Sequence, residues 1–421
     1  MTDSDAASAA AAAARDGYGR LLGLLAAADG DLAGAEDALA DALEQALRRW
    51  PEQGVPHRPE AWLLTVARNR QRDRWRSAET RRTTPLDLDR HARRTVTIDE
   101  VGPDAIGDRR LELMLLCAHP VIDPGVRAPL MLNVVLGFTA AEIGAVFTVP
   151  RATMATRLVR AKRRIRAAGV PFELPDRSHL PARMAAVLEA VYGAYVIEWS
   201  STGSEARPLP PEGLQLAEVL AQVAPADPEA RGLAALVLLS AARAPARTAA
   251  DGRLVPLLEQ DPGCWDRSLI ERGHVHLRAA HARRSVGRFQ LEAAIQATHC
   301  ARLPDQGPDW ATLKQLHLAL HQLAPSRGGT AALAAVLAET DGPAAGLAAL
   351  DQLGEDAVRF QPAWATRAQL LERLGAHAGA LAAYERAIAL TTDPAERAYL
   401  TGRRRAVANR TATRRTDTRR P

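Results

Sequence analysis

Basic side chains recur at helical spacing between residues 151 and 166. This segment holds seven Lys or Arg residues, and no acidic residue occurs between Glu142 and Glu173. On a helix, the residues that share the outward face are Thr153, Arg157, Arg160 and Arg164, and those that share the inward face are Met154, Leu158, Ala161 and Ile165. A row of guanidinium groups binds phosphate oxygens. The chemistry indicated is therefore recognition of a polyanion.

A second, shorter helix is predicted directly before this basic segment. Thr139 and Glu142 have the spacing of a capping box, in which the hydroxyl accepts an amide hydrogen bond and the glutamate reaches back to the cap residue. The short helix is expected to end at Phe147, and residues 148–150 form a turn. Two helices joined by a short turn, the second of them basic, are typical of a DNA-binding helix-turn-helix. A basic helix that only faces solvent is the alternative.

Acidic residues gather on a predicted helix near the N-terminus. No basic residue occurs between Arg20 and Arg48, and the apolar residues of 32–47 keep helical spacing. The helix is expected to end at Trp50, because Pro51 cannot continue it. Acidic residues on its polar face are Asp37, Asp41 and Glu44. This face is either a solvated helix side or a docking surface for a basic partner protein.

The next predicted helix begins at Pro59 and changes character along its length. Its first half carries apolar core residues such as Trp62, whereas arginines surround Trp75 in its second half. The arginines are Arg68, Arg70, Arg72, Arg74 and Arg76. Arginine binds phosphate and exposed bases stack on aromatic rings, so this combination suits nucleic acid. A solvated basic helix end with a core tryptophan is the alternative.

The composition indicates helices throughout. Apolar residues make up 47% of the 421 residues and aromatic residues only 4%, and β-branched residues seldom alternate with polar ones. A chain of this length can bury more than one core, so an all-α protein of three domains is predicted. The net charge of +5 fits a polyanionic partner, but an arginine-rich composition produces the same excess without one.

The cysteines and the apolar segments bear on cellular location. Cys117, Cys264 and Cys300 show no paired spacing for zinc or for a disulfide framework, which suits a reducing cytoplasm. Residues 1–14 lack the basic and leucine-rich regions of an export signal, and no apolar stretch reaches the length of about 18 residues that a membrane span needs. A cytoplasmic protein without a membrane partner is expected.

The C-terminal half alternates short Ala/Leu-rich helical stretches with turn signals. Residues 361–394 match tetratricopeptide spacing, and this helix pair must stack on further pairs between about Leu214 and Leu353, because it cannot bury its apolar face alone. His317 and His321 share a helix face, but no third ligand is near and no metal site is predicted. Neither a phosphate-binding glycine loop nor a catalytic triad occurs, so no cofactor and no enzymatic activity are expected.

Two N-terminal segments resemble region 2 of extracytoplasmic-function sigma factors. Residues 35–43 and 62–69, followed by Asp73, match that region in order and spacing. The resemblance implies that the acidic helix docks on the largest subunit of core RNA polymerase through Asp37, Asp41 and Glu44. It also implies that the following helix faces the minus-ten promoter element and contacts the melted non-template strand through Asn69, Arg70 and Arg74.

Residues 137–147 and 153–165 resemble region 4 of the same family, which reads the minus-thirty-five element. The resemblance assigns base or phosphate contacts to Arg151, Thr156, Arg157 and Arg160. It assigns the role of phosphate clamps to Lys162, Arg163 and Arg164. Ala155 departs from the family, since many relatives carry Lys or Arg there, and a missing contact would change the DNA sequence that is read.

The resemblance covers nearly the whole chain, because a subgroup of these sigma factors has a comparable C-terminal extension. The predicted parts are region 2 at 15–80, a flexible linker at 81–108, region 4 at 109–170, a tetratricopeptide-like helical domain at 180–402 and a disordered basic tail at 403–421. The expected function is promoter-specific transcription initiation, with core RNA polymerase and promoter DNA as partners. The extension is expected to control this activity and to bind a protein or peptide.

Other functions fit parts of the same pattern. A free-standing helix-turn-helix regulator with a protein-binding repeat domain would bind DNA but not polymerase, and the acidic helix argues against it. An interaction scaffold with a relict N-terminus would not depend on Arg157 and Arg160. The extension could also serve stability or oligomerisation instead of control.

Overall fold

Helices make up the regular structure of the described residues. The computed structural model describes residues 3–29, 31–79, 110–170, 180–200, 212–249, 252–302 and 307–417. Within these residues the one β contact is an isolated bridge between Thr248 and Leu254, so the predicted all-α class is confirmed. The chain divides into two compact units, unit 1 (residues 1–197) and unit 2 (residues 198–421). The linker predicted at 81–108 lies outside the described residues.

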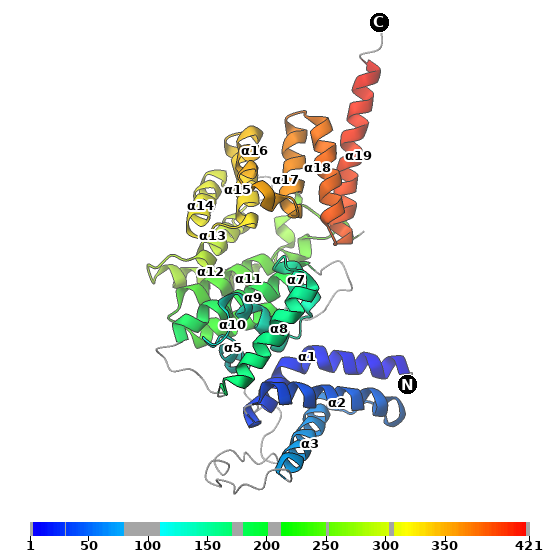
Figure 1. Ribbon diagram of the computed structural model, residues 1–421. Helices are drawn as coiled ribbons and strands as arrows, with labels where there is room; N and C mark the ends of the chain where they lie inside the picture. Colours follow the sequence, from blue (N-terminus) through cyan, green and yellow to red (C-terminus); the bar gives the residue numbers. More distant parts are fainter. Residues whose placement is uncertain are drawn as a thin grey trace. The chain divides into compact units, whose positions relative to one another are not determined.

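Three helices that pack on one another form the first part of unit 1 (Figure 1). They are α1 (Asp3–Asp29), α2 (Leu32–Gln53) and α3 (Pro59–Glu79). The buried Trp50 ring meets Trp62 edge to face, with the ring centroids 5.5 Å apart. The buried Gln71 amide donates to the Leu25 carbonyl at 3.3 Å and ties α3 to α1. These contacts hold the acidic helix α2 and the basic helix α3 against each other.

Helix α2 passes through Pro51, so the predicted end at Trp50 is wrong. A proline in the last turn removes one amide hydrogen bond but leaves the preceding turns intact. The helix ends at Gln53, and the next residue, Gly54, has a φ of +85° that favours glycine. The Gly54 amide donates to the Trp50 carbonyl at 3.0 Å, which closes the helix.

Five further helices follow among the described residues of unit 1. They are α5 (Arg110–Cys117), α6 (Pro124–Val134), α7 (Ala140–Val146), α8 (Arg151–Ala167) and α9 (Leu180–Ser200). Residues 180–197 of α9 belong to unit 1, so the domain boundary predicted at 180 is wrong. The reason is packing, since the Arg183 side chain donates to the Leu115 carbonyl of α5 at 3.1 Å. Pro181 lies in the first turn of α9, where proline is tolerated.

Unit 2 begins with four helices, of which one is buried nearly all round. They are α10 (Glu212–Val223), α11 (Pro228–Ala241), α12 (Arg267–His281) and α13 (Arg288–Cys300), with the 3-10 helices η4 (Ala244–Ala246), η5 (Leu257–Glu259) and η6 (Pro262–Cys264) after α11. Helix α11 packs on α10, α12 and α13, and every residue from Gly232 to Ala241 is buried. Its uniformly apolar sequence is typical of a central helix.

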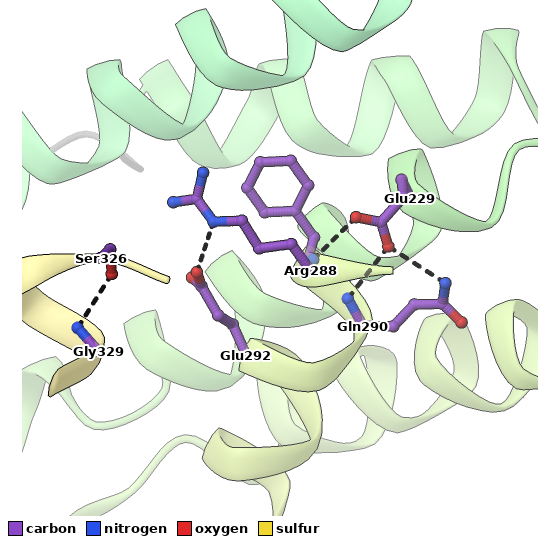
Figure 2. A network of polar contacts seen from close by, with 7 residues as sticks. Glu229, Arg288, Gln290, Glu292, Ser326 and Gly329 are labelled. Carbon is purple, nitrogen blue, oxygen red and sulfur yellow. Dashed lines mark hydrogen bonds and ion pairs between the residues drawn. The ribbon is translucent and has the colours of Figure 1, made fainter. Parts of the chain in front are cut away.

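A carboxylate of α11 caps the N-terminus of α13 (Figure 2). Glu229 accepts hydrogen bonds from the Phe289 amide at 2.9 Å, the Gln290 amide at 3.3 Å and the Gln290 side chain at 3.1 Å. The cap residue of α13 itself is Gly287, which has no side chain for this purpose. The first amides of a helix have no partner within it, so Glu229 supplies from another helix what a neighbouring Ser or Asp usually supplies.

The remaining helices of unit 2 pack successively on their neighbours (Figure 1). They are α14 (Trp310–Leu323), α15 (Arg327–Thr340), α16 (Pro343–Asp351), α17 (Gln361–Arg373), α18 (His377–Leu390) and α19 (Pro394–Asp417), with the 3-10 helix η7 (Gly354–Ala357). Three cores overlap along this series, at α13 to α15, at α15 to α17 and at α17 to α19. Each helix pair therefore buries its apolar face on the next, and the pair predicted at 361–394 is present as α17 and α18.

The disorder predicted from residue 403 onward is wrong for residues 403–417, which continue α19. Val407 is fully buried in the core with α17 and α18. Arg403 and Arg410 pair with Glu372 of α17, the former at 2.9 Å. Burial alone would raise the pKa of Glu372, but hydrogen bonds from Arg403 and Tyr384 and the arginine charges lower it. The basic composition was misleading because these arginines neutralise a half-buried carboxylate.

Candidate nucleic-acid interface

Helices α7 and α8 are joined by a short turn, as the sequence predicts. Thr139 Oγ1 accepts from the Glu142 amide at 3.3 Å and the Glu142 carboxylate accepts from the Thr139 amide at 2.7 Å, so the predicted capping box is confirmed. At Gly144 a Cβ would lie 2.5 Å from the Val149 carbonyl oxygen. The turn thus approaches α7 so closely that Gly144 has to be glycine, a requirement that the sequence interpretation missed.

Helix α8 carries its apolar and basic side chains on different faces. Its buried residues are Met154, Leu158, Ala161 and Ile165. Its exposed residues include Arg151, Thr153, Thr156, Arg157, Arg160, Arg163 and Arg164. The Thr156 hydroxyl donates to the Ala152 carbonyl at 2.9 Å, so its oxygen can still accept a hydrogen bond from a partner. An exposed guanidinium face of this kind can contact phosphates on both sides of a groove.

Lys162 lies apart from this exposed face. Its ammonium nitrogen is 2.5 Å from Glu36 Oε1 of α2, and the two side chains are 23% and 17% exposed. One turn further along α8, Arg166 lies 3.6 Å from Asp31, the N-cap of α2. The charge that was expected to hold a phosphate is paired here with a carboxylate.

The sequence interpretation missed this pairing. Asp31 and Glu36 belong to the same acidic stretch as Asp37. Spacing alone does not show which of these residues pairs with a basic residue of the same chain. One signal was present, since Lys162 is one of only two lysines in a chain whose other basic residues are arginine or histidine. A lysine kept where arginine is the rule indicates a site that suits a compact ammonium group.

The three residues predicted to dock polymerase lie along the polar side of α2. Asp37 is exposed, and Glu44 pairs with Arg48 of the same helix at 2.6 Å. The half-exposed Asp41 lies 3.7 Å from Arg70 of α3. The structure therefore brings one predicted polymerase contact together with one predicted DNA contact. Exposed ion pairs contribute little to stability, so these side chains stay available to partners.

The residues predicted to contact the minus-ten element lie in the second half of α3. Asn69 and Arg70 are exposed. Arg74 is part of α3, but its side chain lies outside the described residues. Burial and the charge of Arg72 lower the pKa of Arg68, which therefore belongs more to the helix packing than to the exposed basic surface.

Neither a metal site nor a membrane span is present in the described residues. Among them no group of three or more His, Cys, Asp or Glu side chains is arranged to hold a metal ion. No helix in the same part of the chain is long and apolar enough to cross a membrane. His317, which the sequence placed on one face with His321, is buried in α14.

Two histidines, the buried His317 and the largely buried His299, are expected to make unit 2 sensitive to acid. Burial, together with the charges of Arg243, His317 and Arg302, lowers the pKa of His299 to about 3, and burial lowers that of His317 to about 4. In the unfolded chain these histidines have a pKa near 6.5, so below that pH the unfolded chain binds more protons than the folded chain. The stability contributed by the neutral histidines is therefore complete above pH 6.5 and falls toward pH 4, with a loss of roughly 2–4 kcal/mol between pH 7 and pH 5.

Thermal unfolding of the whole chain from pH 7.5 to pH 5 measures this loss. The double variant His299→Gln/His317→Gln should show a flatter dependence on pH, because glutamine does not titrate. His281→Gln is the control, since His281 is exposed at the end of α12 and its replacement should keep the wild-type slope. Equal slopes in the wild type and the double variant would contradict the assignment.

Parts of the chain match known families. Residues 15–81 match sigma-70 region 2, and residues 183–281 match a family of unknown function, DUF6596. The chain is 35% identical over 373 residues to an uncharacterized protein of Rhizobium meliloti (strain 1021), an alignment that covers 87% of this chain and 88% of that protein. No solved structure matches the chain.

The region 2 match, which spans most of α1 and continues through α3, supports a sigma factor of the sigma-70 family with a role in transcription initiation. Such a factor binds core RNA polymerase and promoter DNA. Over most of its length, the chain belongs to the same family as the Rhizobium meliloti protein. The DUF6596 match includes α9 of unit 1 and continues into unit 2.

Proposed function

We propose that this sigma factor is of the extracytoplasmic-function type and recruits core RNA polymerase to promoters with two recognised elements. The polar side of α2, with Asp37, Asp41 and Glu44, docks on the polymerase. The second half of α3, with Asn69, Arg70 and Arg74, contacts the melted strand of the minus-ten element. The chain catalyses no reaction itself and acts in the cytoplasm, where polymerase and promoter lie.

The exposed basic face of α8 carries the proposal of a second promoter contact. It follows a capped helix and a tight turn, which is the order of elements in a DNA-binding helix-turn-helix. Early residues of such a helix, here Arg151, Thr156 and Arg157, reach base edges, and later ones, here Arg160, Arg163 and Arg164, hold phosphates. This arrangement supports recognition of the minus-thirty-five element.

Unit 2 is proposed to control this activity as a tetratricopeptide-like array that binds a protein or peptide. The overlapping cores from α13 to α19 support the array, because stacked helix pairs form an extended surface. A role in stability or oligomerisation is the alternative. In that case unit 2 of a monomeric protein would affect neither the choice of promoter nor the transcript yield.

In vitro transcription from fragmented genomic DNA tests the proposal on all promoters of a genome at once. Core RNA polymerase transcribes DNA of the organism that encodes the chain, with and without the purified protein, and the transcript 5′ ends are sequenced. We expect new start sites that share two upstream motifs and that appear only with both components. A free-standing DNA-binding regulator would bind DNA but give no new starts with core enzyme alone, and that result would contradict the proposal.

A further inference from the structure

Both lysines of the chain form ion pairs between different helices. Lys314 of α14 lies 2.7 Å from Asp341, at the end of α15. Lys162 of α8 lies 2.5 Å from Glu36 of α2, which is 126 positions away in the sequence. The first pair lies within the helical array of unit 2. The second joins the helix proposed to read DNA to the helix proposed to dock polymerase.

The Lys162 pair is less accessible than an ordinary surface ion pair. Its two side chains are 23% and 17% exposed, whereas the nearby pair of Arg166 and Asp31 is 58% and 50% exposed. Both pairs join the C-terminal half of α8 to the N-terminal half of α2. Partial burial limits screening by salt and makes the charge-assisted hydrogen bond of Lys162 stronger than an exposed one.

Close packing around these pairs supports the contact. At Gly19 of α1 a Cβ would lie 1.7 Å from the Val135 carbonyl oxygen, so the backbones meet where no side chain fits. The Tyr18 ring lies against Gly137, just beyond α6. Burial raises the pKa of the Cys117 thiol. The charge of Glu36 raises this pKa further, and the charge of Lys162 lowers it. The ion pairs thus lie beside a closely packed junction between α1, α2 and the helices α5 to α8.

We propose that Glu36 and Asp31 form a latch that holds Lys162 and Arg166 away from DNA until the protein engages a promoter. A phosphate and a carboxylate compete for the same cation, so α8 can place these two side chains on DNA only after it leaves α2. The two promoter elements lie on separate stretches of the duplex. For this reason too, α8 has to move away from α2 and α3 before each part can reach its own element. The opening step rests on the proposed function, whereas the closed contact in the free chain does not.

Zero-length crosslinking tests the closed contact directly. A carbodiimide activates a carboxylate, and an amine in contact with it displaces the urea to form an amide, so only paired groups are joined. We expect two side-chain crosslinks in the free chain by mass spectrometry, Lys162 to Glu36 and Lys314 to Asp341. The second is an internal control within unit 2. A Lys314 crosslink without a Lys162 crosslink would overturn the latch.

The same crosslinks report on opening. In a complex with core polymerase and a promoter, the Lys162 crosslink should fall at least roughly fivefold while the Lys314 crosslink stays constant, because DNA phosphates replace Glu36 at the ammonium group. An unchanged Lys162 crosslink in a complex that gives transcript would overturn the competition. If the chain gave no transcript, the proposed function would fail while the free-chain crosslink would still decide whether the latch forms.

A conservative substitution provides a second, independent measurement. Glu36→Gln keeps the shape of the side chain and removes its charge, and it should raise the affinity of the free chain for promoter DNA roughly 10- to 100-fold, as expected for loss of one charge-assisted pair. Glu52→Gln removes the same charge from an exposed position on α2 and controls for the change in net charge. Equal affinities of the two variants would contradict the latch.

Discussion

Reversal of the charges of Arg157 and Arg160 is expected to abolish promoter-specific transcription. Both side chains are exposed on α8, while the apolar face of this helix is buried elsewhere, so Arg157→Glu/Arg160→Glu should leave the fold intact. Each lost base or phosphate contact costs about 1–3 kcal/mol, and the new carboxylates also repel phosphate. Together these effects predict a loss of roughly 100-fold or more in promoter affinity and transcript yield.

A matched control separates specific contacts from net charge. Arg267→Glu/Arg283→Glu makes the same change in net charge at exposed positions of unit 2 and should keep promoter affinity within about threefold. The promoter affinity of the wild type should also fall steeply as the salt concentration rises. For the α8 variant, the slope of log affinity against log salt concentration should be shallower by the amount expected for about two phosphate contacts. Near-normal transcription by the α8 variant would contradict a promoter contact through Arg157 and Arg160.

Loss of the Glu229 carboxylate is expected to unfold the start of α13. Glu229→Ala removes three hydrogen-bond acceptor contacts, to the Phe289 amide, the Gln290 amide and the Gln290 side chain (Figure 2). Hydrogen bonds to a charged group are worth about 1.5–3 kcal/mol each, but water replaces part of the loss at this half-buried site, so a total of roughly 2–4 kcal/mol is expected. Hydrogen exchange of α13 peptides, followed by mass spectrometry, measures the local free energy of opening.

The adjacent Gly287 allows a double-mutant cycle. A Cβ at Gly287 would lie 2.2 Å from Glu229 Cδ, so Gly287→Ala should displace the capping carboxylate and cost about 2 kcal/mol. The backbone at Gly287 is extended, with a φ of −134°, and any residue adopts that conformation. In the Glu229→Ala background the same substitution should therefore be neutral or stabilise α13 by up to about 1 kcal/mol. Additive effects would show that Gly287 acts independently of the cap.

The sequence by itself determined the elements whose residues interact over one or two turns. The two faces of α8 and the helix pair of α17 and α18 follow from apolar spacing, which is a property of a single helix. The capping box of Thr139 and Glu142 was predictable because both partners lie within four positions. The region 2 segments were identifiable for the same reason, since their acidic and basic residues follow one another along the chain.

Only the tertiary structure decided which partners those elements choose. The Lys162 pair with Glu36, the Glu229 cap on α13 and the Glu372 pairs with Arg403 and Arg410 all join residues far apart in the sequence. The identity of each residue was visible, but its partner depends on how helices pack. For this reason a basic segment that composition marked as a disordered tail continues α19, and a lysine expected to bind phosphate is paired with a carboxylate of α2. Local periodicity fixes a helix and its faces, whereas the packing of distant helices fixes where each charge is neutralised.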